Sequence, residues 1–541
     1  MIGGVFDRQG LDCQICPLLK GYLGLPFCYR YNTKGIYIKK KVAIIGAGPG
    51  GLAAAMLLSH RGYDVAVYEK EASVGGRTGR YIIDGYIFDI GSTFLMLPQF
   101  IEEVFALAGK DIRDYVEIKP LDPLYRLRFD DGTEFHPSTD TEKTIAEIQR
   151  LFPGEVDNYL RFMRNEGYRY RRIERCFKVP YDSVYDFLSP HFIEALPQME
   201  ITGTLRERLE GYFRHDKMRL AMAFQTKYIG MSPWRAPSVY SLISYVEHRW
   251  GIHHVRGGLN QLTLAMAKVV EEYGGRVYTS TKVSQVLRRD KTATGLLLED
   301  GQEISADYIV INADFAYAMS SLIGSRRKKY TDDNLQRRDY SCSTFMLYLG
   351  VNKTYDIPHH NLILGSDFKA HMDDITMTRS PSSMSMVYVH NPIVTDDTLA
   401  PRGKSPIYVL VPVPNNKAQI DWGGFKQGFR KQVLDFIVKK TGMTDIEQHI
   451  EVEKIMTPHN WESDLNVYNG AVFNLSHDLG QMFWFRPHNR SEELSNCYIV
   501  GGGTHPGSGL PNICISSVIT SEQLIRDDTG DRRWAFEKTH L

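Results

Sequence analysis

The strongest constraint on the fold of this chain is a glycine-rich motif between a predicted strand and a predicted helix. The motif reads Gly46-Ala-Gly48-Pro-Gly50-Gly51 and follows an apolar strand at 41–45. Its first glycine permits a tight turn, the second removes the side chain that would block a pyrophosphate, and the last lets the helix pack closely on the strand. The helix N-terminus then offers free N–H groups to phosphates. The motif predicts a dinucleotide-binding βαβ unit.

Residues that follow this motif favour FAD over NAD as the dinucleotide. A second strand, at 64–68, ends on Glu69, whose carboxylate is placed to bind a ribose diol, and Lys70 comes next. Gly75-Gly76-Arg77 then offers another close backbone approach, with a cation that a nicotinamide domain does not need. The alternatives are an ordinary tight loop for the glycines and a surface ion pair for Arg77. Because all these parts fall in register, we interpret them as an FAD site.

A second glycine-rich loop, near the C-terminus, predicts contacts to the flavin itself. A strand at 497–500 leads into a loop with five glycines, and a helix is expected over 512–526. Gly502 and Gly503 would let the backbone approach the ribityl chain, and Pro511 suits a helix start. This helix N-terminus would stabilise negative charge on the reduced ring.

The chain contains no second strand-linked glycine motif for NAD(P)H and no redox-active cysteine pair on its main body. We therefore expect electrons to pass from a substrate to FAD and then to oxygen or a quinone.

Composition narrows the partners. Lysine plus arginine equals aspartate plus glutamate, at 64 each, so the net charge provides no overall attraction to nucleic acid. No apolar run is long enough for a transmembrane helix. The N-terminus also lacks the basic segment followed by an apolar segment that is typical of a signal peptide, so a cytoplasmic chain is expected.

Cys13 and Cys16 form a CxxC near Cys28, but a fourth ligand is missing, so we expect no metal.

The chain is expected to pass repeatedly between two structural units. We divide it into an N-terminal extension (1–39), three FAD-binding parts (40–120, 251–340 and 461–541), a helical, membrane-facing substrate part (121–250) and a substrate-domain sheet (341–460).

Three local patterns support this division. A hairpin is predicted at 125–135, mostly helical structure at 141–230, and a return to the nucleotide sheet at 276–314, where the backbone of Val283 would contact the adenine. The aromatic and basic run at 168–175 suits either a segment resting on lipid headgroups or a solvated helix face with buried tyrosines.

The chain resembles the bacterial phytoene desaturases, especially their dehydrosqualene (4,4'-diapophytoene) desaturase branch, over about residues 40–527. Besides the glycine motif, the resemblance is carried by segments 88–93, 223–230, 236–243, 257–258, 340–345, 360–361, 411–414, 485–487 and 504–507. The last, Thr504-His505-Pro506-Gly507 with the glycines before it, is the most specific.

The resemblance implies an α/β protein in which a glutathione-reductase-like Rossmann FAD domain is interleaved with an α+β substrate domain of mixed sheet plus helices. It also implies non-covalent FAD, peripheral membrane attachment and a long, linear isoprenoid substrate, desaturated by hydride transfer from an allylic carbon to flavin. Substrate length, C30 or C40, the number of steps and the oligomeric state stay open.

The predicted cofactor-binding residues come from the two glycine loops, the ribose site and the segment after Asp89. They are Gly46, Gly48, Gly50, Gly51, Glu69, Lys70, Gly75, Gly76, Arg77, Gly91, Ser92, Thr93, Val283, Gly502, Gly503, Pro511, Asn512 and Ile513. Two of these segments depart from the family pattern: Ser92 stands where a proline is common, and Asn512 where a glycine is common.

No catalytic base can be assigned from sequence. His505 is a weak candidate by position, with a structural role in its loop as the alternative. Glu247 and His248 could face a substrate tunnel or form a solvated helix end, and Asp89 more readily anchors a loop. Rival functions are a carotenoid isomerase, a saturase or a terminal-methyl oxidase on the same scaffold, or a non-catalytic lipid-binding protein like the GDP-dissociation inhibitors.

Overall fold

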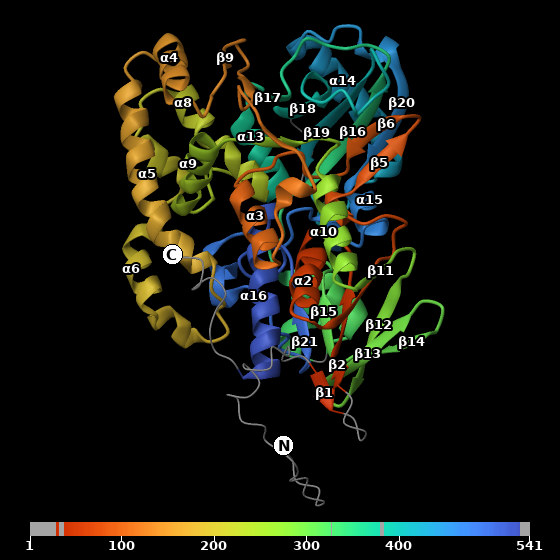
Figure 1. The fold of residues 1–541 in the computed structure, drawn as a ribbon. Coiled ribbons are helices and arrows are strands. Elements are labelled where there is room, and N and C mark those ends of the chain that lie inside the picture. The colour runs from red at the N-terminus through yellow and green to blue at the C-terminus, as the bar shows by residue number, and fades with distance from the viewer. Residues whose placement is uncertain (1–28, 32–36, 326, 379–383, 531–541) are drawn as a thin grey trace, which may run out of the picture.

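The structure is a computed structural model that describes residues 29–31, 37–325, 327–378 and 384–530 (Figure 1). One unit is built on a five-stranded parallel sheet with strand order β11-β4-β3-β15-β21. The strands are β3 (Lys41–Ile45), β4 (Asp64–Tyr68), β11 (Arg276–Tyr278), β15 (Tyr308–Ile311) and β21 (Cys497–Ile499). Because they come from three distant stretches of the chain, the sheet forms only when those stretches meet.

Different layers cover the two faces of this sheet. One face, with Val42 and Ile44, packs on a helical layer, and the other, with Ala43 and Ile45, packs on a small antiparallel sheet. The helical layer is α2 (Pro49–His60), α3 (Pro98–Leu107), α10 (Asn260–Glu272) and α16 (Leu510–Thr529), and the small sheet is β12 (Val283–Arg289), β13 (Thr292–Leu298) and β14 (Glu303–Ser305). Burial on both faces explains why the central strands are continuous apolar runs.

The second unit is built on a seven-stranded sheet with strand order β20-β16-β19-β18-β17-β8-β9. Its strands are β8 (Arg126–Arg128), β9 (Glu134–Phe135), β16 (Ser343–Val351), β17 (His360–Leu364), β18 (Met386–His390), β19 (Ser405–Val413) and β20 (Ile450–Met456), all antiparallel to their neighbours except the pair β8 and β17. Successive side chains of β16 point to opposite faces of the sheet. Phe345 and Leu347 therefore pack against α14 (Trp422–Thr441), whereas Tyr348 lies on the opposite face. That opposite face borders the site described below.

Helices from the middle of the chain lie beside this sheet, at one edge of the molecule (Figure 1). They are α4 (Thr141–Leu151), α5 (Val156–Phe177), α6 (Pro190–Met199), α7 (Leu205–Glu210), α8 (Asp216–Ala221) and α9 (Ser241–Trp250). The described residues also form the short helices α11 (Phe315–Tyr317), α12 (Asp332–Arg337), α13 (Phe368–Asp373) and α15 (Pro458–Ser463). Three two-stranded ribbons are β1/β2 (Tyr29–Tyr31, Tyr37–Lys39), β5/β6 (Arg80–Ile83, Tyr86–Asp89) and β7/β10 (Ile118–Pro120, His253–Val255), and several short helices of other types, labelled η, connect the elements.

The expected α/β fold is confirmed, with two local differences. The hairpin at 125–135 is present, but it joins the second sheet through the pair β8 and β17. The C-terminal helix begins at Leu510, because Gly509 (φ 104°) ends the loop and Pro511 fits the first turn. Cys13, Cys16 and Cys28 lie outside the described residues. Within the described ranges, no helix is long and apolar enough to cross a membrane.

Candidate functional site

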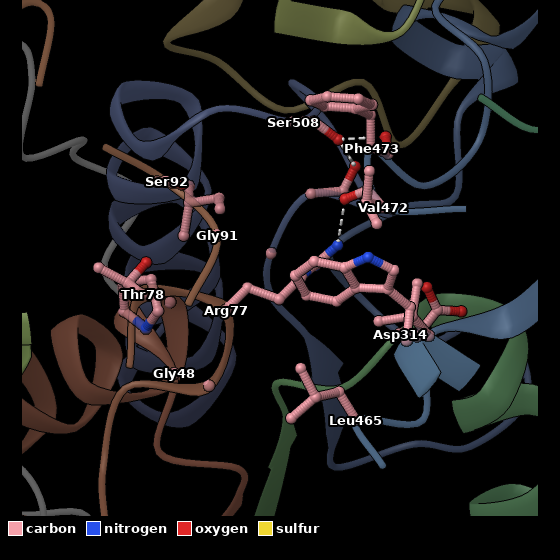
Figure 2. A pocket seen from close by; sticks show the side chains of 18 of the residues that line it. Gly48, Arg77, Thr78, Gly91, Ser92, Asp314, Leu465, Val472, Phe473 and Ser508 are labelled. Atoms are coloured by element: carbon pink, nitrogen blue, oxygen red, sulfur yellow. Dashed lines mark hydrogen bonds between the residues drawn. The ribbon is translucent and has the colours of Figure 1, made fainter. Parts of the chain in front are cut away.

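A cavity of ≈ 360 Å³ lies where the parallel strands end and the seven-stranded sheet begins, a size typical of ligand sites. The residues after β3, β4, β15 and β21 border it, the position where open α/β sheets bind their ligands. Figure 2 shows Gly48, Arg77, Ser92 and Asp314 gathered around it. Its walls therefore combine both units.

The first glycine loop borders this cavity, and the atoms packed against it leave no room for side chains at its glycines. A Cβ on Gly46 or Gly51 would overlap a backbone oxygen, and a Cβ on Gly50 would lie 2.7 Å from Oδ1 of Asn312. Nδ2 of Asn312 donates to the Gly46 carbonyl (3.1 Å). Asn312 follows β15, the strand next to β3, and thus holds the loop from the end of the neighbouring strand, a role that sequence reasoning did not assign.

Glu69 ties the ends of two strands together. Its carboxylate accepts hydrogen bonds from the backbone N–H groups of Ala47 (2.7 Å) and Glu71 (2.9 Å). Burial raises the pKa of this carboxyl, while the two backbone N–H groups oppose the shift. Because each oxygen retains acceptor capacity, the carboxylate can still bind a ligand hydroxyl in the cavity.

Arg77 belongs to a buried polar cluster, in contrast to the surface ion pair considered as an alternative. Its Nη1 donates to the Val472 carbonyl (2.7 Å; Figure 2). With its amide oriented to satisfy both neighbours, Asn474 accepts from Arg77 Nη2 (3.2 Å) and donates to Asp314 (3.0 Å). Burial raises the pKa of Asp314 to about 6, and Arg77 limits that rise.

Three tyrosines of the seven-stranded sheet fix the segment 90–93. Tyr348 donates to the Ile90 carbonyl (2.5 Å), Tyr408 donates to the Gly91 carbonyl (2.6 Å), and the hydroxyls of Tyr388 and Thr93 are 2.7 Å apart. Gly91, Ser92 and Thr93 consequently line the cavity at the junction of the two units. The sequence named this segment but gave no sign of its tyrosine partners.

Arg486 and His477 hold the second glycine loop. The fully buried Arg486 guanidinium donates to the carbonyls of Gly502 (2.7 Å) and Thr504 (3.1 Å), and burial lowers its pKa to about 10. His477 Nε2 accepts from the N–H of Ser508 (3.0 Å). These contacts aim the start of α16 at the cavity.

Most of the predicted cofactor residues border one cavity. They are Gly46, Gly48, Gly50, Glu69, Lys70, Gly76, Arg77, Gly91, Ser92, Thr93, Val283, Gly502, Pro511 and Ile513. The other four are Gly51, Gly75, Gly503 and Asn512, which are not part of the lining but follow or precede lining residues in the chain. The side-chain amide of Asn512 donates to the Ser508 carbonyl (2.9 Å).

His505 is placed away from the cavity lining. Its ring lies against Tyr181 and Phe483, with centroids 5.1 and 6.0 Å away, and burial lowers its pKa to about 3. A neutral, ring-packed histidine favours the structural role over the catalytic one.

The cavity end away from Glu69 is mainly aromatic and apolar. Phe94, Tyr228, Met346 and Met372 line it, together with Lys227. Glu247 and His248, considered as tunnel residues or a solvated helix end, are instead buried and absent from the lining. Glu247 accepts hydrogen bonds from Gln225 (2.9 Å) and Tyr228 (2.9 Å).

Three buried histidines, His359, His360 and His390, meet behind Tyr388, with one nitrogen of each within 4.8 Å of the others. His359 and His390 are hydrogen bonded to each other (Nε2 to Nε2, 3.0 Å), and His360 Nδ1 is 2.8 Å from the Tyr388 hydroxyl. Burial lowers the pKa of all three well below 6.5. We interpret them as a network of neutral imidazoles, and the absence of a metal stays a prediction.

Comparisons with known proteins agree with this geometry. Residues 49–524 match the family described as flavin containing amine oxidoreductase. A putrescine oxidase variant of known structure shares the fold, with a TM-score of 0.60 over 91% of this chain and 99% of that protein, at 14% identity.

Two curated relatives are similar in sequence. The 4,4'-diapophytoene desaturase (4,4'-diapolycopene-forming) of Methylomonas sp is 46% identical over 90% of this chain and 95% of its own length. The zeta-carotene-forming phytoene desaturase of Myxococcus xanthus is 34% identical over 90% and 94%. The chain therefore belongs to the flavin-containing amine oxidoreductase family and, within it, to the carotenoid desaturases.

Proposed function

We propose that this chain is an FAD-dependent desaturase that removes hydrogen from a linear C30 polyene of the 4,4'-diapophytoene type. The observation that carries the proposal is the cavity that joins two glycine loops to an aromatic, apolar end. The name of the Methylomonas sp relative supports a C30 over a C40 substrate. The two desaturase relatives also disfavour the isomerase, saturase, oxidase and lipid-binding alternatives.

The residues on the cavity wall fit FAD. Helices α2 and α16 both begin there without a side-chain cap, so each offers free N–H groups to phosphate or to the electron-rich edge of a flavin. Glu69 would accept from the adenosine ribose, and Gly48 and Gly50 would leave room for the pyrophosphate. Bound FAD supplies the hydride acceptor, and we propose that its electrons then pass to oxygen or a quinone.

Cys342 supports non-covalent binding. It lines the cavity, but burial raises the pKa of its thiol to about 12, so the nucleophilic thiolate is scarce. The protein would hold FAD through hydrogen bonds and helix ends alone.

The apolar end of the cavity would receive the polyene and exclude water. Phe94, Met346 and Met372 present surfaces that suit a hydrocarbon chain. Tyr388 and Tyr228 keep their hydroxyls in hydrogen bonds with Thr93 and Glu247, so their ring faces remain for substrate contact.

An exposed apolar surface on η3 (Val184–Leu188) and α6 supports peripheral membrane attachment. It consists of Val184, Tyr185, Leu188, Ile193 and Leu196 on these two helices and of Ile201 just after α6, and Tyr185 is 75% exposed. Figure 1 shows α5 and α6 together at one edge of the molecule. Arg171, Arg172 and Arg175 of α5 are exposed too, which suits anionic headgroups. A substrate dissolved in lipid could be drawn from this side.

Expression in two hosts, one that makes 4,4'-diapophytoene and one that makes phytoene, tests the function. We expect conjugated products with red-shifted absorbance in the C30 host, identified by chromatography and mass. Unchanged C30 precursor beside flavin-loaded protein would contradict the proposal. A blue shift would indicate a saturase, an unchanged mass an isomerase, and added oxygen a terminal-methyl oxidase.

A further inference from the structure

Lys227 is a buried cation in the apolar end of the cavity. It lies in the short helix η4 (Phe224–Ile229), whose residues Phe224 and Ile229 are core side chains, and it lines the cavity. Gly230 ends the turn at φ 68°, where a Cβ would lie 2.7 Å from Phe473. η4 thus places Lys227 on the wall of the space assigned to the substrate.

Aromatic rings surround the Lys227 ammonium. Its Nζ lies 4.8 Å from the ring centroid of Tyr388, 5.4 Å from Tyr228, 5.8 Å from Phe224 and 5.9 Å from Phe94. Within the described part of the chain it has no ion-pair or hydrogen-bond partner. An unpaired amine in such a site has a free lone pair whenever it is deprotonated.

Burial makes the neutral amine accessible near neutral pH. It lowers the pKa of Lys227 to about 7, an effect that the Glu247 carboxylate partly offsets. The titratable groups that face this region are Glu247 of α9, Tyr125, Tyr228 of η4, Tyr388 of β18 and His360 of β17. Burial raises the pKa of the three tyrosines and lowers that of His360, so these four groups stay neutral. Burial also raises the pKa of Glu247, but its hydrogen bonds and the nearby Lys227 oppose that rise and favour the carboxylate.

We propose that Nζ of Lys227 is the proton acceptor of the desaturation, an inference that rests on the proposed function. When FAD is bound, it would supply the acceptor for a hydrogen that leaves one allylic carbon with its electron pair. The neighbouring carbon loses a proton to the Lys227 lone pair, and the electrons of that C–H bond form the new C=C bond. Lys227 becomes an ammonium and returns the proton to solvent before the next step.

The surroundings suit both protonation states of such an acceptor. Before transfer, the apolar wall favours the neutral amine. After transfer, four ring faces and the Glu247 carboxylate stabilise the ammonium. Glu247 itself is less suited to the role, because Gln225 and Tyr228 already bind its oxygens.

The test uses flavin-loaded wild type, Lys227→Met and Lys227→Arg, with Lys431→Met, an exposed position on α14, as the matched control. Anaerobic flavin reduction by 4,4'-diapophytoene in vesicles is followed from pH 6 to 9. We expect the wild-type rate to rise with pH, with the inflection at about pH 7. Lys227→Met should be slower by about 100-fold or more at pH 8 and should lose this pH dependence.

Lys227→Arg should be slow as well, because a guanidinium stays protonated, whereas Lys431→Met should match the wild type. A Lys227→Met rate close to the wild-type rate, with the same pH profile, would overturn the proposal. No flavin reduction in the wild type would instead refute the proposed function. If Lys227→Met does not retain flavin, Lys227→Gln replaces it.

A second measurement does not depend on turnover. Holoenzyme labelled with [ε-¹³C]lysine is titrated by NMR, and the resonance missing from Lys227→Arg is assigned to Lys227. We expect an inflection near pH 7, whereas an inflection above pH 9 would overturn the proposal.

Discussion

The buried ammonium of Lys227 should make the stability of the protein depend on pH in a way that Lys227→Met removes. A lysine titrates at about 10.5 in an unfolded chain, and burial lowers the pKa of Lys227 to about 7 in the folded state. Between these values the unfolded state binds more protons, so the free energy of unfolding rises with pH. Below about pH 7 the folded protein carries the full penalty of the buried charge.

The size of the penalty follows from the two pKa values. A difference of about 3.5 units corresponds to roughly 5 kcal/mol, at about 1.4 kcal/mol per unit. Cation–π contacts with the four rings oppose it by about 1–2 kcal/mol. We therefore expect Lys227→Met to be about 3–4 kcal/mol more stable than wild type at pH 6, and this advantage to shrink toward pH 10.

Urea unfolding of the apoprotein at pH 6 and at pH 9.5, followed by fluorescence and circular dichroism, measures both differences. Lys431→Met serves as the control and should change stability by less than about 1 kcal/mol at either pH, because its ion pair with Asp435 is exposed. An equal stability difference between wild type and Lys227→Met at the two pH values would refute this reasoning.

Three other changes test the remaining parts of the site. Glu69→Ala removes the acceptor of two backbone N–H groups and of the ribose, so FAD should bind about ten- to a hundredfold more weakly by fluorescence titration; unchanged affinity would mean that the carboxylate does not contact the cofactor. Gly48→Val should abolish FAD binding by blocking the pyrophosphate, since even a Cβ would lie 2.9 Å from Asn312, and a flavin-loaded variant would refute that placement. Leu188→Glu with Ile193→Glu should reduce co-sedimentation with anionic vesicles while flavin content stays the same, and undiminished sedimentation would exclude this surface as the attachment site.

Both glycine loops could be predicted from sequence because their signals are local. A turn after a strand, a close backbone approach and a helix start each demand particular residues within a few positions, as in the run from Gly46 to Gly51 and at Pro511. The α/β fold followed from the same elements. Most residues of these motifs border one cavity, and they could be named without structural information.

The residues that join the two units could not be predicted in this way. Asn312 supports the first glycine loop, and Tyr348 and Tyr408 hold the segment at 90–91, but nothing in their local sequence specifies these distant partners. Lys227 was part of a quoted family segment, yet its burial among aromatic rings depends on η4 and β18 meeting in space. His505 was chosen for its place in a loop, but its side chain packs against Tyr181 and does not line the cavity.

The proposed function requires that one cavity bring a bound flavin and a C30 polyene together. Mixing purified, flavin-loaded protein with 4,4'-diapophytoene in vesicles, without oxygen, tests it by the flavin absorbance and by the extracted pigment. We expect loss of the oxidised flavin band with formation of one new double bond per flavin reduced. An oxidised flavin beside unaltered substrate, in protein that has retained its cofactor, would contradict it.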